Sequence, residues 1–267
     1  MNAALESDFF VLPPSSVVVD RGSYFAVFCK ERPDFVFGNY LALKSPPAPS
    51  QLKEWAEIWI REFEASECSR TIAFQWEDYS DNAKSPEDFS KVALTCKFTQ
   101  ERSVIMQLAS PPAAVSPSVW VSRPVTSEHD WSEAEELLES ELEDSLPGDS
   151  FTRWRFAQFR ALVGLGKGEW WGLWADAQLI GTAGIFWTEE NRIGRLQNVV
   201  TRTGFRNRGV CTRLCQEIVH ARVYRLNLTQ LIVVAAEGSQ ASGIYCRLGF
   251  RPIGVQTSLS KSVTEQV

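Results

Sequence analysis

The sequence lacks the features expected of a membrane protein or of a general nucleic-acid binder. No apolar run approaches the roughly 18 residues that a membrane-spanning helix needs. The opening residues, "MNAALESDFF", have no basic stretch before an apolar one, so no secretory signal peptide is expected. The formal net charge is -6, whereas binders of nucleic acids or membrane surfaces usually carry a net positive field. We therefore expect a cytoplasmic protein with neither kind of partner.

Patterns for metals, disulfides and nucleotides are also scarce. Only His129 and His220 are histidines, and the six cysteines show no small-domain spacing. Cys211 and Cys215 could share a helix face, but a zinc site would need two further ligands. We expect free thiols and no metal site. Neither a G-x-x-x-x-G-K-[ST] loop nor a G-x-G-x-x-G turn followed by an acidic residue is present.

One segment is rich in proline, serine and alanine and indicates a boundary between domains. It is "ASPPAAVSPSVW" at 109–120, which can neither continue a helix nor pair as a central strand. We place a linker at 113–118, an N-terminal domain at 1–112 and a C-terminal domain at 119–267.

Before the linker, short segments rich in aromatic and β-branched residues alternate with helical patterns. Strands are expected at 24–28, 35–43, 71–76 and 103–109, and helices at 51–65 and 85–94. The "FGNY" stretch at 37–40 is either a substrate-facing turn or, as we prefer, a strand with a bulge at Gly38. This half contains no glycine-rich turn and no clustered polar set.

After the linker, the pattern predicts a strand, two helices, a hairpin turning near Asp176, and a strand at 193–201. A basic turn, a long helix, a strand at 229–237, a short helix at 239–250 and final strands follow. The fold class expected is α+β. It consists of a mixed, mostly antiparallel sheet flanked by helices, preceded by a second, smaller α+β domain.

The stretch at 198–219, "NVVTRTGFRNRGVCTRLCQEIV", predicts a strand, a turn and a helix. It concentrates arginines in an otherwise acidic chain, with no Asp or Glu before Gln216. The first N–H groups of a helix lack intrahelical partners, and the helix dipole adds about half a positive charge there. Gly209 would let a bulky anion approach the backbone. A pyrophosphate cradle is plausible, although an exposed basic loop would look similar.

Two motifs resemble those of the GNAT superfamily of acetyl-CoA-dependent N-acyltransferases. "RNRGVC" is similar to that family's [QR]-x-x-G-x-[GA] turn, with Cys211 where the family has Gly or Ala. "ASGIYCRLGF" supplies the alanine, tyrosine, basic residue and Gly-Phe that follow in the family. The resemblance covers the chain from about residue 119 to its C-terminus.

The resemblance implies a transferase that uses acetyl-CoA as donor. In it, Tyr245 would protonate the leaving thiolate, although a core tyrosine is the alternative. Main-chain groups of Val199, Val200 and Thr201 would pair with the pantetheine arm and polarise the thioester. The residues implied to hold the pyrophosphate are Arg206, Asn207, Arg208, Gly209, Val210, Cys211 and Thr212.

The acceptor side is less defined. Glu189, Glu190 and Glu237 lie near predicted strand ends and could deprotonate an ammonium, and we select Glu190. The acidic stretch at 128–149 could attract a cationic amine or be a solvated helix face. We expect an N-acetyltransferase acting by direct attack of a primary amine, on a small molecule rather than a protein, as a monomer or homodimer. The alternative is a non-catalytic GNAT-like module that senses acyl-CoA or another ligand. The first half could be a degenerate copy of the second, as in tandem GNAT proteins.

Overall fold

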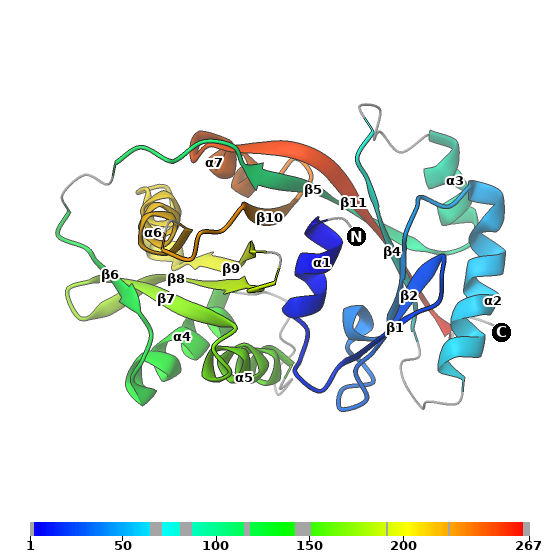
Figure 1. Ribbon diagram of the computed structural model, residues 1–267, viewed down its shortest axis with the longest axis horizontal. Coiled ribbons are helices and arrows are strands. Elements are labelled where there is room, and N and C mark those ends of the chain that lie inside the picture. Colours follow the sequence, from blue (N-terminus) through cyan, green and yellow to red (C-terminus); the bar gives the residue numbers. More distant parts are fainter. Residues whose placement is uncertain are drawn as a thin grey trace. The chain divides into compact units, whose positions relative to one another are not determined.

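The computed structural model describes residues 3–64, 71–80, 87–114, 118–141, 151–190, 192–223 and 225–263. The chain folds into two compact units. The first unit comprises Met1–Ile105, Val234–Ser239 and Pro252–Val267, and the second comprises Met106–Val233 and Gln240–Arg251. Figure 1 follows the helices and strands of each unit along the chain.

The first unit combines a mixed sheet with helices. Its strand order is β1-β2-β3-β4-β11-β5, in which β3 and β4 are parallel and the pair β4–β11 is antiparallel. Its strands are β1 Val17–Asp20, β2 Tyr24–Phe28, β3 Tyr40–Leu43, β4 Thr71–Asp78 and most of β5 Thr99–Leu108 and β11 Phe250–Ser262. Its helices are α1 Ala3–Phe10, α2 Leu52–Phe63 and α3 Glu87–Thr95, with 3-10 turns at Val36–Gly38 and Pro49–Gln51.

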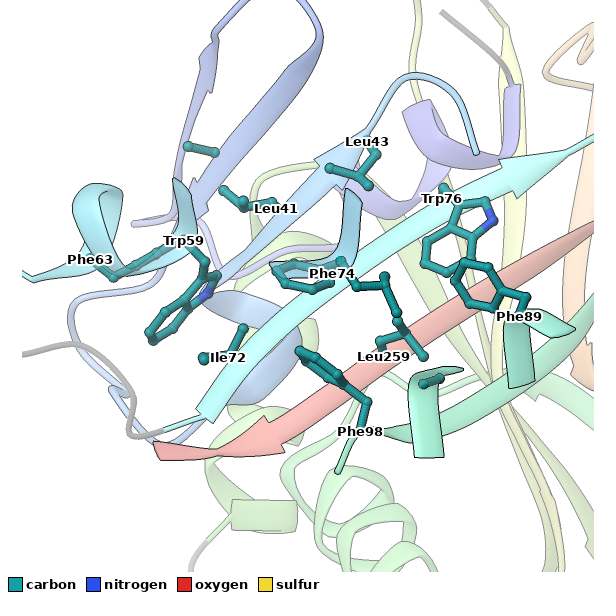
Figure 2. Packing of buried hydrophobic residues seen from close by; sticks show 13 residues of the cluster. Leu41, Leu43, Trp59, Phe63, Ile72, Phe74, Trp76, Phe89, Phe98 and Leu259 are labelled. Carbon is teal, nitrogen blue, oxygen red and sulfur yellow. The ribbon is translucent and has the colours of Figure 1, made fainter. Parts of the chain in front are cut away.

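The core of the first unit is aromatic (Figure 2). On α2, Trp59 and Phe63 are stacked with ring centroids 4.8 Å apart. Phe74 of β4 and Leu259 of β11 are both fully buried in the same cluster. The apolar residues of the helix predicted at 51–65 therefore form the face of α2 that packs on the sheet.

The segment expected as one strand at 35–43 is instead a 3-10 turn, Val36–Gly38, followed by the short strand β3. The buried amide of Asn39 closes this turn, because its oxygen accepts from the Cys29 N–H and its nitrogen donates to the Phe35 carbonyl. A Cβ at Gly38 would lie 2.3 Å from the Phe35 ring. Close packing in a turn, and not a strand bulge, therefore requires this glycine.

The second unit has the strand order β10-β9-β8-β7-β6, antiparallel except for the parallel pair β9–β10. Its strands are β6 Val121–Pro124, β7 Gly168–Ala175, β8 Gln178–Trp187, β9 Ile193–Thr201 and part of β10 Gln230–Ala236. Its helices are α4 Glu128–Glu141, α5 Phe151–Gly164, α6 Val210–Ile218 and α7 Gln240–Arg247, with a 3-10 turn at Thr203–Phe205 and a π-helical segment at Val219–Val223. The expected α+β class with a mostly antiparallel sheet is confirmed.

The sheet of the second unit is held by a buried aromatic group. Trp170 of β7 packs against Phe156 and Phe159 of α5 with ring centroids 5.0 and 5.4 Å away. Its indole N–H donates to the Thr182 hydroxyl on β8 at 2.6 Å. Asp176 lies in the hairpin turn between β7 and β8 with φ 50°, as the sequence predicts. These contacts fix the strands that lead to the candidate site.

The predicted domain boundaries at 112 and 118 stay predictions, because the two compact units are defined by packing and each contains more than one segment of the chain. Residues 115–117 of the predicted linker lie outside the described residues. The described helices include none long and apolar enough to cross a membrane. Cys29, Cys96, Cys211, Cys215 and Cys246 are free thiols, while Cys68 lies outside the described residues.

Candidate functional site

Strand β9 carries a bulge close to its C-terminal end. Thr182 pairs with Val200 and Gly184 pairs with Gln197, so β9 has one residue more than β8 between these pairs. Asn198 lies there with φ 48°, a left-handed conformation that asparagine adopts more readily than most residues. A bulge bends the strand and re-aims the residues that follow it. The strand predicted at 193–201 does not include this bulge.

Beyond the bulge, one edge of β9 is open. The parallel register between β9 and β10 ends at the pair Arg195 and Ile232. Residues 199–201 continue to pair with β8 through Val200 and Thr201, but in the described part of the chain they have no register with β10. Their other backbone edge is therefore available to an extended ligand.

The turn after β9 exposes backbone amides. Asn207 and Gly209 both have positive φ, 60° and 84°, and α6 begins immediately afterwards at Val210. The Arg213 N–H donates to the Gly209 carbonyl at 2.9 Å, which places Gly209 at the helix N-cap. The amides of the first helical turn precede this bond and lack intrahelical acceptors. The strand–turn–helix predicted from the sequence is present.

A cavity of about 520 Å³ joins the open strand edge to this helix end. All of the cofactor-binding residues expected from the sequence line it except Arg208, whose guanidinium lies over the Phe205 ring at 5.4 Å. The lining residues are Glu141, Val199, Val200, Thr201, Phe205, Arg206, Asn207, Gly209, Val210, Cys211, Thr212, Gln240, Ala241, Ile244 and Arg247.

Glu141, the last residue of α4, holds the turn in place, and neither sequence motif indicates this role. Its carboxylate accepts hydrogen bonds from the Thr203 N–H at 2.7 Å and hydroxyl at 2.6 Å, and pairs with the Arg206 guanidinium at 2.7 Å. Burial raises the pKa of Glu141, but the bonds from Thr203 and the charge of Arg206 outweigh it, and the pKa is lowered. Glu141 therefore stays ionised and orients Arg206.

Tyr245 lies on α7 beside the cavity but is not among the described residues that line it; Ala241 and Ile244 of the same helix are. It is 5% exposed, and its ring packs edge-on against Phe250. Burial raises the pKa of its phenol far above the ordinary value, and the sulfurs of Cys215 and Cys211 act in the same direction. The phenol is therefore protonated at neutral pH.

The carboxylates considered as bases lie in two separate places. Glu189 and Glu190 are exposed in the turn between β8 and β9. Both precede β9, whose first residue Ile193 is six positions before Val199, or about 20 Å along an extended strand. Glu237 pairs with Arg102 at 2.9 Å. None of the three is among the described residues that line the cavity, and the role of Glu190 stays a prediction.

Comparison with known proteins identifies the domain. Residues 166–252 match the family model described as an acetyltransferase (GNAT) domain. A functionally unknown conserved protein from Staphylococcus epidermidis superposes with a TM-score of 0.73 at 15% identity, over 93% of this chain and 94% of that one. A GCN5-related N-acetyltransferase from Kribbella flavida gives 0.63 at 16%, over 97% and 93%. No curated protein matches the sequence.

A tandem GNAT protein from the clavulanic acid biosynthesis pathway also shares the fold, with a TM-score of 0.61 at 14% identity, over 98% of this chain and 88% of that one. Residues 166–252 are therefore a GNAT domain, in a chain whose fold is that of GCN5-related N-acetyltransferases. The resemblance inferred from the two motifs is confirmed.

Proposed function

We propose that this protein transfers an acetyl group from acetyl-CoA to a primary amine of a small molecule. The observation that carries the proposal is that one cavity connects the open edge of β9 with the first turn of α6. Acetyl-CoA needs both features, because it has an extended amide-containing arm at one end of a diphosphate. The membership of residues 166–252 in the GNAT family supports acyl transfer from this donor.

The diphosphate would lie at the start of α6. The amides of residues 210–212 are free to donate to its oxygens, and the helix dipole adds about half a positive charge. Arg247 lines the same cavity and contributes further positive charge, whereas the charge of Arg206 is offset by its ion pair with Glu141. Gly209 keeps the approach open, since an added Cβ there would meet nothing within 4 Å and would project into free space.

The pantetheine arm would extend along residues 199–201 as an added strand. A backbone N–H of this segment would donate to the thioester carbonyl and stabilise the oxyanion that forms when the amine attacks. The attack forms the C–N bond and breaks the C–S bond. Tyr245 would give its phenolic proton to the departing thiolate. Glu190 is the predicted base, and because it lies near the other end of β9 from residues 199–201, it would take the proton from the acceptor ammonium through water.

The test is release of CoA thiol from acetyl-CoA in the presence of a panel of small primary amines. The proposal expects amine-dependent release, together with acetylated amine in equal amount. Binding of acetyl-CoA by calorimetry without release across the panel would contradict the transfer. In the same assay, Glu190→Gln is expected to lower turnover, and unchanged turnover would remove Glu190 from the mechanism.

A second candidate function is a non-catalytic sensor of acyl-CoA. It is favoured by the position of Tyr245, which is buried and outside the described lining of the cavity. For a sensor, acetyl-CoA should raise the thermal unfolding temperature while no amine is consumed. The amine panel distinguishes the two functions.

A further inference from the structure

Two thiols of α6 lie at the cavity and have no part in the proposed transfer. Cys211, in the first turn of the helix, lines the cavity. Cys215, one turn later, is fully buried. The two residues are four apart on α6, which places their side chains next to each other on the helix surface. Cys211 is therefore accessible to solutes in the cavity, and the Cys215 thiol is the neighbouring hydrogen-bond donor within the helix.

The surroundings favour the thiolate of Cys211. The hydrogen bond from Cys215 lowers the pKa of Cys211, burial opposes it, and the positive charge of Arg247 lowers it further. Its place in the first turn of α6 adds the field of the helix dipole. The pKa of Cys215 is raised because it donates that bond and is fully buried. The lower pKa and the access to the cavity make Cys211 the more reactive thiol of the pair.

The helix geometry disfavours a disulfide within the pair. The Cβ atoms of residues four apart on a helix are about 5–6 Å from each other. A disulfide needs Cβ atoms about 3.5–4.5 Å apart, so joining the two would distort the first turn of α6. Both sulfurs thus remain thiols in the folded protein, and Cys211 stays available to react with molecules that enter the cavity.

We propose that Cys211 is a covalent modification site, at which small anionic disulfides form a mixed disulfide inside the cavity. The thiolate attacks one sulfur of the disulfide, the Cys211 S–S bond forms as the original S–S bond breaks, and the second sulfur leaves as a thiolate. An added thiol reverses the exchange. Arg247, which lines the same cavity, selects for an anionic reagent together with the dipole of α6, whereas the charge of Arg206 is offset by Glu141.

The adduct would control ligand binding at this site, a consequence that rests on the proposed function. Cys211 and the amides of residues 210–212 face the same cavity. A group attached to the Cys211 sulfur occupies the space above the first turn of α6. Binding of CoA and modification of Cys211 are then mutually exclusive.

The experiment compares two reagents on the intact chain, the anionic 5,5′-dithiobis(2-nitrobenzoate) and the uncharged 4,4′-dithiodipyridine. Peptide mass spectrometry follows Cys211 and, as internal control, the exposed Cys246 of α7. We expect the anionic reagent to modify Cys211 at least tenfold faster than Cys246, and the uncharged reagent to show a smaller ratio. Equal rates at the two cysteines with the anionic reagent would overturn the proposal.

Two variants test the role of the buried donor. Cys215→Ser keeps a hydrogen-bond donor and is expected to retain the fast modification of Cys211. Cys215→Ala removes the donor and should slow Cys211 several-fold while Cys246 reacts as before. Circular dichroism shows whether both variants fold. If Cys215→Ala slows the modification of Cys211 and Cys246 equally, or if the folded variant slows neither, Cys215 does not support the reactivity of Cys211.

The same assay separates this proposal from the proposed function. Saturating CoA should protect Cys211 and leave Cys246 reactive. If Cys211 reacts fast but CoA gives no protection, the modification site stands and CoA binding at α6 fails. If calorimetry shows CoA binding while Cys211 reacts no faster than Cys246, the modification site fails and the proposed function stands.

Discussion

At the residue scale, Gly209 carries the argument for an anion site. It has φ 84°, a conformation that costs a residue with a Cβ about 1–2 kcal/mol, and it borders the cavity. Gly166, at φ 73°, is equally open but lies outside the described cavity lining. Matched substitutions at Gly209 and Gly166 therefore distinguish the effect of backbone strain from the loss of the ligand site.

We predict that Gly209→Val weakens CoA binding at least tenfold in calorimetry, because its side chain stands where the diphosphate approaches. Gly166→Val should lose a similar amount of stability in denaturant unfolding but keep its affinity for CoA. Equal affinities of the two variants would argue against a diphosphate at Gly209.

Tyr245→Phe is predicted to lower turnover by about a hundredfold, as loss of a positioned acid does, with the dissociation constant of acetyl-CoA nearly unchanged. The control is Tyr40→Phe, at a buried tyrosine of the first unit, which should keep full turnover. If Tyr245→Phe turns over at the wild-type rate, the acid role is rejected.

Motif spacing was sufficient to find Gly209 and Arg206, because both belong to one local turn. It could not find Glu141, which reaches Thr203 across 62 positions of sequence. The acidic stretch at 128–149 predicts either an acceptor-side feature or a solvated helix face, yet the side chain of Glu141 is only 7% exposed and pairs with Arg206. Contacts of this kind depend on the packing of α4 and carry no local sequence pattern.

At the element scale, the start of α4 is held by a buried carboxylate. Asp130 accepts two hydrogen bonds from the Arg123 guanidinium, at 2.6 and 2.8 Å, and further bonds from the Ser127 and Thr126 amides. The Ser127 hydroxyl accepts from the Asp130 N–H, completing a capping box. The pKa of Asp130 is therefore held well below its ordinary value.

We predict that Asp130→Asn lowers the free energy of unfolding by about 2 kcal/mol at pH 7, the scale for hydrogen bonds to a charged group. A carboxyl with a lowered folded-state pKa adds stability above its unfolded pKa, about 4, and loses it as pH falls further. The difference between wild type and variant should therefore shrink below pH 4. Denaturant unfolding across pH measures it.

The matched control is Glu135→Gln, at an ion pair with Arg153 in which the arginine is 64% exposed. An exposed pair contributes little, so we expect a loss of less than about 1 kcal/mol. An Asp130→Asn loss as small as this control, or one that does not change with pH, would show that the carboxylate does not anchor α4.

Most elements of the second unit follow from periodicity, but the β9 bulge does not. The bulge is a shift in the pairing register with β8, opposite Thr182 and Gly184, and it therefore depends on the neighbouring strand and not on the local sequence. The helix after the turn also differs from expectation, since α6 ends at Ile218 and continues as a π-helical segment. Strand and helix types can be read from local pattern, whereas bulges and helix irregularities depend on neighbours.

At the scale of the whole molecule, the chain does not pack in sequence order. β11 begins within the matched GNAT segment, yet most of it belongs to the first unit, where Leu259 pairs with Phe74 and shares its core. No local pattern in the tail predicts that partner. This is why the α+β class could be derived from the sequence, while the assignment of the final strand could not.

We predict one CoA per chain by calorimetric titration. In the second unit an arginine-rich turn joins β9 to α6, whereas the stretch between β4 and α3, "YSDNAKSP", contains neither arginine nor glycine. The first unit thus lacks the sequence of a phosphate turn. A stoichiometry of two would contradict its interpretation as a degenerate copy.

The most direct measurement is a crystal structure of the protein with CoA. The account predicts that diphosphate oxygens accept hydrogen bonds from main-chain nitrogens of residues 210–212, with the pantetheine arm along residues 199–201. A diphosphate bound elsewhere, with this cavity empty, would contradict it.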